Sequence, residues 1–133
     1  MPDAAPSPFA YAILRVIPHV ERGERLNAGV VVYCRQRQFL AAEVRLDRDR
    51  LRALAPDAPV DEIEDRLLTI RRIAAGDPRC GAVARLPLPD RFGWLVAPAS
   101  TIVQPSEVHT GLCCDPAQTL DELFARLVTV PAR

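Results

Sequence analysis

The stretch FAYAILRVIPHVERGERLNAGVVVYC, residues 9–34, contains two apolar segments joined by a short charged connection. The first segment, Phe9 to Val20, is rich in aromatic and β-branched residues and predicts a strand. The second, Leu26 to Cys34, is almost continuously apolar, which is typical of a strand buried on both faces. Arg22 and Gly23 mark a turn between them. Because so short a connection joins only antiparallel neighbours, these residues predict a hairpin at the centre of a sheet.

The following segments extend this hairpin. Phe39 to Leu46 follows a polar turn at residues 35–37 and predicts a third strand, so the three strands form an antiparallel meander. Thr101 to Gln104 and Val108 to Cys113 are predicted to be shorter strands, and Cys80 to Leu86 is a further candidate. Each of these later segments is too short to place in the sheet from its pattern alone.

Two main helices have well-marked ends. The first runs from about Pro59 to Ala75, with apolar residues three and four apart, an acidic first turn, a basic last turn and Gly76 as its cap. The second begins with Asp115 as N-cap, Pro116 at the first helical position and Gln118 completing a capping box. The predicted fold class is therefore α+β, an antiparallel β-meander with further short strands packed against two main helices.

Between these elements the pattern is less regular. Asp47 is predicted to cap a short helix from Arg48 to Ala55. Residues 77–98 are interrupted by prolines, and Arg91 to Val96 is either a helical turn or a strand that buries Trp94.

The length of 133 residues is typical of one domain. We expect a flexible leader at residues 1–8 and a single α+β domain over residues 9–133. Nothing resembles a signal peptide, and the longest apolar run, Ala28 to Cys34, is far shorter than the roughly 20 residues that span a bilayer. We therefore expect a cytoplasmic protein that does not contact a membrane, with its cysteines reduced.

Charge and composition exclude several classes of function. The formal net charge is zero, which argues against nucleic-acid binding through a basic surface. All 17 basic residues are arginine. Without lysine the chain can form no Schiff base and can supply neither the lysine of a P-loop nor that of a protein kinase.

Polar side chains gather in two segments. The turn at residues 19–27 carries His19, Glu21, Arg22, Glu24, Arg25 and Asn27, which is more than a hairpin turn requires. Its arginines could bind a carboxylate or a phosphate, although exposed ion pairs on a solvated turn are the plainer interpretation. The second segment, residues 100–111, combines hydroxyl groups, an amide and His109 and could line a ligand site, with the imidazole as a general base.

Cysteine and arginine positions give two further expectations. Cys113 and Cys114 are adjacent, whereas zinc sites space their ligands more widely, so we expect no metal site and no cofactor. A zinc site formed by Cys113, His109 and a distant thiol is a weaker alternative. Arg15 lies within an apolar strand, and we expect it to form a structural ion pair with Glu43 or Glu24.

The run YAILRVIPHVERGERLNAGVVVYC, together with TIVQPSEVHTG and DPAQTLDELFARLV, resembles the bacterial domain-of-unknown-function family 3037. The resemblance extends from about Tyr11 to Val128. Its most specific parts are the Arg22-x-Glu24-x-x-Asn27-x-Gly29 pattern and residues 108–111. The family implies no activity, but its members are often encoded near HipA-like kinases, which implies such a kinase as a partner.

No catalytic pair is recognisable, so the sequence favours binding over catalysis. The leading hypothesis is a non-enzymatic accessory module for a partner protein or a small anionic ligand, bound through Arg22, Glu24, Asn27, His109, Thr110 and Gly111. The alternative is a small metal-independent hydrolase or phosphodiesterase, in which His109 is the base and Arg22 stabilises negative charge. Both hypotheses require the two polar segments to meet in space.

Overall fold

The computed structural model describes residues 5–129, which form one antiparallel sheet of five strands together with four α-helices. Strands β1 (Ser7–Val16), β2 (Leu26–Cys34) and β3 (Phe39–Val44) form the meander. β1 and β2 lie inside the sheet, and β3 lies at one edge. The predicted α+β class and antiparallel meander are confirmed.

The opposite side of β1 is paired by two short strands in succession. β4 (Val103–Pro105) pairs with its second half and β5 (His109–Cys113) with its first half. Between them the Ser106 N–H donates to the Ile13 carbonyl at 2.7 Å, and the Ser106 Oγ accepts from the Ile13 N–H at 2.8 Å. The two predicted short strands therefore act as one interrupted strand along β1.

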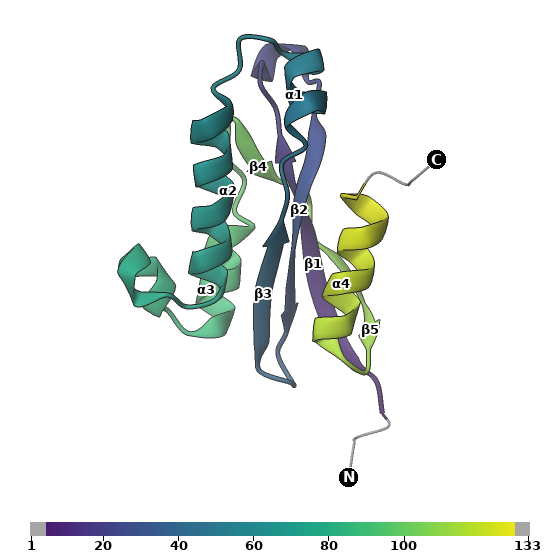
Figure 1. Ribbon diagram of the computed structural model, residues 1–133. Helices are drawn as coiled ribbons and strands as arrows, with labels where there is room; N and C mark the ends of the chain where they lie inside the picture. The colour runs from purple at the N-terminus through teal and green to yellow at the C-terminus, as the bar shows by residue number, and fades with distance from the viewer. Residues whose placement is uncertain (1–4, 130–133) are drawn as a thin grey trace.

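Helices cover both faces of the sheet. α2 (Val60–Ala74) and α3 (Leu88–Leu95) pack on one face, here called the α2 face, and α4 (Pro116–Leu127) packs on the other, the α4 face (Figure 1). The alternation of β1 and β2 sorts the core between the two faces. The α2 face buries Ala12, Leu14, Val16, Val31, Ile63, Leu67 and Ile70, and the α4 face buries Val30, Val32, Leu120 and Leu123.

The helix ends follow the predicted local chemistry with one exception. Asp47 accepts from the Arg50 N–H at 3.1 Å and caps α1 (Arg48–Leu54). Asp115 caps α4 by accepting from the backbone N–H groups of the second and third helical residues. The predicted capping box is wrong, because the Gln118 amide donates to Glu122 one turn along α4, at 3.2 Å. Gly76 follows α2 with φ of 80°, as expected of a C-terminal glycine.

The first predicted strand is displaced toward the N-terminus. β1 begins at Ser7, inside the predicted leader, and ends at Val16. Residues 1–4 of that leader lie outside the described residues. The chain beyond Val16 leaves the sheet near Pro18, which has no N–H to donate, and forms a 3₁₀ turn at Val20–Arg22.

For residues 77–98 the predicted strands are wrong, whereas the alternative of a helical turn at Arg91 to Val96 is confirmed by α3. The candidate strand at Cys80 to Leu86 is instead a pair of 3₁₀ turns, Pro78–Cys80 and Val83–Arg85, since this segment has no neighbouring strand to pair with. Trp94 is not buried: its exposed fraction is 43%. It lies in α3, where Phe92 and Leu95 form the buried side of the helix.

Candidate functional site

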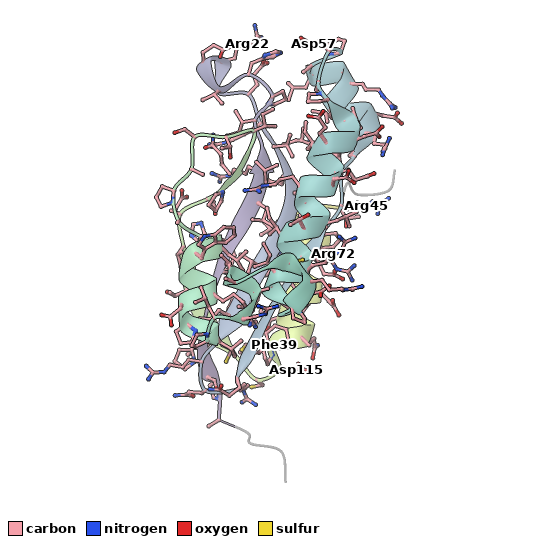
Figure 2. The ribbon with its side chains drawn as sticks, turned by 90° about the vertical axis from the view of Figure 1, so that its left-hand side faces the viewer. Arg22, Phe39, Arg45, Asp57, Arg72 and Asp115 are labelled. Atoms are coloured by element: carbon pink, nitrogen blue, oxygen red, sulfur yellow. The ribbon has the colours of Figure 1, made fainter. Side chains whose placement is uncertain are left out.

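Arg22 and Glu24 form an ion pair at the hairpin end of the molecule. Their Nε and Oε1 atoms lie 2.5 Å apart, and both side chains are exposed. The hydrogen bond from Arg22 lowers the pKa of the Glu24 carboxyl. His19 lies 3.5 Å from Asp57 at the same end, and Figure 2 shows Arg22 and Asp57 there together. The charged side chains of the turn are therefore largely paired with acidic side chains close by.

His109 lies far from that turn. It opens β5 opposite Tyr11, its ring packs on the Tyr11 ring at a centroid distance of 5.1 Å, and its Nε2 is 3.6 Å from a Glu107 carboxylate oxygen. Tyr11 and Val16 are separated by about 16 Å of extended strand, and Arg22 lies beyond Val16. Figure 1 shows β5 beside the lower part of β1, away from the hairpin end. The predicted meeting of Arg22 with His109 is therefore wrong.

The two polar segments do meet at Arg15. Arg15 is in register with Asn27 of β2 on one side and with Gln104 of β4 on the other. Its neighbour Val16 is buried on the α2 face, so these three side chains project from the α4 face. Asn27 donates from Nδ2 to the Leu127 carbonyl at 3.0 Å, which places the group beside the C-terminal end of α4.

The expected ion pair of Arg15 is wrong. Glu43 pairs with Arg71 at 2.9 Å and Glu24 with Arg22, and Arg15 forms no ion pair among the described residues. Its Nε is buried and has no hydrogen-bond partner there. The Nε of Arg91 is also buried without a partner, but the same guanidinium donates to two backbone carbonyls through Nη1. Arg15 has no comparable anchor.

Glu107 interacts electrostatically with this group. A hydrogen bond from its own backbone N–H lowers the pKa of its carboxyl, and Coulombic interactions with Arg15, His109 and Arg25 lower it further. Glu107 is exposed, at 72%. We call the set the Arg15 patch, consisting of Arg15, Arg25, Asn27, Gln104, Glu107 and His109.

Thr110 and Gly111 do not join the Arg15 patch. Successive residues of β5 point to opposite faces, so Thr110 projects away from the face that carries His109. Gly111 lies beneath the Phe9 ring, and a Cβ at this position would come within 2.7 Å of Phe9 Cε1. A Cβ here would therefore push against the Phe9 ring.

The thiols form no recognised site. Cys34 and Cys113 are buried free cysteines. Burial raises the pKa of the Cys113 thiol, and the neighbouring Cys34 raises it further. Over residues 5–129 there is no group of three or more His, Cys, Asp or Glu side chains that could hold a metal ion. In the same range every helix is too short or too polar to cross a membrane.

The larger hollows lie away from the Arg15 patch. One of about 520 Å³ runs along the edge of β3 between α2 and α4, and another of about 530 Å³ lies between α2 and residues 101–103. No pattern in the sequence predicted the groove beside β3. The third predicted strand had no predicted partner on its outer side, which indicated an open sheet edge. The groove itself could not be predicted, because its walls come from helices far apart in the chain.

Comparison with known proteins identifies a family but no activity. The family model described as "Protein of unknown function (DUF3037)" matches residues 11–128. No curated protein and no solved structure matches the chain.

Proposed function

Because the chain belongs to the DUF3037 family, whose description states no activity, we propose a function from its own surface: a non-catalytic module that binds an anionic group, a carboxylate or a phosphate, at the Arg15 patch. The observation that carries this proposal is the buried Nε of Arg15, which has no partner among the described residues. An unsatisfied buried donor costs about 1–3 kcal/mol, and an anion that draws the guanidinium outward to its own oxygens would offset that cost.

The chemistry of the patch favours an anion over a cation or a neutral ligand. A guanidinium presents a planar set of donors that matches the oxygens of carboxylates and phosphates. Arg25 adds a second positive charge near Glu107, and the Asn27 side chain is in register beside Arg15.

The source of the anion defines the biological role. A carboxylate or phosphorylated side chain on a partner protein would make this chain an accessory module, and the family resemblance implies a HipA-like kinase as that partner. Such a module would act in the cytoplasm. The hydrolase alternative has less support, because Arg22 is held by Glu24 and lies beyond the end of β1, far from His109.

The test is a titration with sodium phosphate at constant ionic strength, followed by backbone and side-chain NMR. We expect saturable shifts at Asn27, Gln104 and His109 in the wild type and their loss in Arg15→Met. Arg50→Met removes an exposed arginine of α1 and is the matched control, which should behave like the wild type. Equal phosphate shifts in Arg15→Met and the wild type would remove the proposed site. A parallel titration with sodium acetate distinguishes phosphate from carboxylate selectivity.

A further inference from the structure

The exposed edge of β3 presents backbone groups that no other strand uses. Among the described residues β3 pairs only with β2. The Arg45 N–H donates to the Ala28 carbonyl at 2.8 Å, so alternate residues upstream also direct their backbone groups toward β2. Leu40, Ala42 and Val44 then direct their N–H and C=O groups outward.

This edge is recessed between two helices. A groove of about 520 Å³ follows it and is lined by residues of α2 and α4. Figure 1 shows β3 between these two helices. Figure 2 shows Phe39, Arg45 and Arg72 along this edge of the molecule. The groove is lined by Phe39, Ala41, Ala42, Glu43, Leu68, Arg71, Arg72, Ala75, Ala117, Leu120 and Asp121. An open strand edge within a groove is the arrangement by which proteins accept an added strand.

The two walls differ in chemistry. The α2 wall contributes two arginines, Arg71 and Arg72, and Arg72 forms no ion pair among the described residues. The α4 wall contributes the apolar Ala117 and Leu120 together with one acid, Asp121. Side chains of an added strand would alternate between these walls, because successive residues point to opposite faces.

One ion pair crosses the open edge. Glu43 is opposite Val30, a residue of the α4 face, whereas Arg71 comes from α2, and their Oε1 and Nε atoms lie 2.9 Å apart. Charged groups at a sheet edge protect it from unwanted pairing. Both side chains are partly exposed, so the pair contributes little to stability and is easily displaced.

We propose that the β3 edge binds an extended segment of a partner protein by antiparallel or parallel strand addition, with acidic side chains facing α2 and apolar side chains facing α4. An incoming carboxylate takes the place of Glu43 at Arg71 and adds a contact to Arg72. A second copy of this chain fits less well. Two-fold pairing of β3 edges would bring the Arg71 and Arg72 side chains of both copies together.

The test uses a fluorescent, end-capped synthetic peptide in which valine and glutamate alternate, with binding followed by anisotropy. A peptide of the same composition with its glutamates clustered is the control, and we expect it not to bind. Arg72→Glu should weaken binding of the alternating peptide about tenfold, since a favourable charge contact becomes a repulsive one. Glu43→Gln should tighten it, because Arg71 becomes free. Arg50→Glu, on α1, is the matched charge reversal and should have no effect.

Hydrogen exchange provides a second measurement that does not depend on a variant folding. The alternating peptide should protect the amides of Leu40, Ala42 and Val44 and leave those of Phe39, Ala41 and Glu43 unchanged. Unchanged exchange at the three outward amides under saturating peptide would overturn the proposal. Protection of these amides without peptide at high protein concentration, together with a dimer in sedimentation, would also overturn the proposal. The edge would then bind a second copy of this chain. Arg15→Met should leave peptide binding intact, so this test is independent of the anion site.

Discussion

Replacement of Arg15 by methionine is expected to stabilise the protein. The guanidinium leaves a buried N–H without a partner, and a group of this kind costs about 1–3 kcal/mol. Methionine keeps an unbranched apolar stem of similar reach on the face shared with Ile13 and removes the unsatisfied donor. We expect the free energy of unfolding to rise by about 1–2 kcal/mol, which corresponds to an increase in Tm of roughly 3–8 °C for a domain of this size.

Urea unfolding followed by circular dichroism, in a buffer free of phosphate, measures this change. The slope of the unfolding free energy against urea should stay the same, because the fold is unchanged. Glu107→Gln is the matched control. It removes the acidic side chain of the patch, and because Glu107 is exposed we expect a change within about 0.5 kcal/mol.

Added phosphate should stabilise the wild type but not Arg15→Met, so the difference in stability between the two proteins should shrink. The wild type gains stability as phosphate binds the folded state, by about 1.4 kcal/mol at ten times the dissociation constant, whereas Arg15→Met gains none through this site. A fall in stability of 1 kcal/mol or more in Arg15→Met without phosphate would refute the reasoning. That result would show that the contacts of Arg15 stabilise the fold by more free energy than its unsatisfied donor costs.

Two further predictions follow from local geometry. Gly111→Ala should destabilise the protein by about 1–3 kcal/mol, because the new methyl group meets the Phe9 ring at 2.7 Å. Gly93→Ala in α3 places its methyl group in open space and should be neutral or stabilising. Thermal unfolding of the two variants separates these outcomes. The Glu24 carboxyl has a pKa below its ordinary value of 4.5 because Arg22 donates to it, so its contribution to stability is present above that value and is lost as the pH falls through the folded-state pKa. The urea midpoint should therefore fall less between neutral and acidic pH in Glu24→Gln than in the wild type. An equal fall in both proteins would contradict this assignment.

The candidate site was only partly predictable. Asn27 and His109 lie in the Arg15 patch, and both belong to polar segments that were singled out by residue type. Arg22 and Glu24 satisfy each other at the hairpin end, and Gly111 serves the packing of Phe9. Residue types indicate what chemistry a segment can offer, but strand register decides which face each side chain reaches.

The amino-acid sequence by itself determined the elements whose signals are local. The apolar alternation and short turns of residues 9–44 specify the meander, and Asp47, Gly76 and Asp115 mark helix ends through bonds to backbone groups nearby in the chain. Turn chemistry, capping and hydrophobic periodicity each act over a few residues. They can therefore be read without knowing the rest of the fold.

Only the tertiary structure decided how distant segments combine. Ser106 joins two short strands to β1 across 93 residues of chain, Arg15 meets neither predicted acid, and the groove beside β3 has one wall from α2 and one from α4. These arrangements depend on long-range pairing and on which face of the sheet each helix covers. Such choices are set by packing of the whole domain, because many registers and placements satisfy the same local pattern.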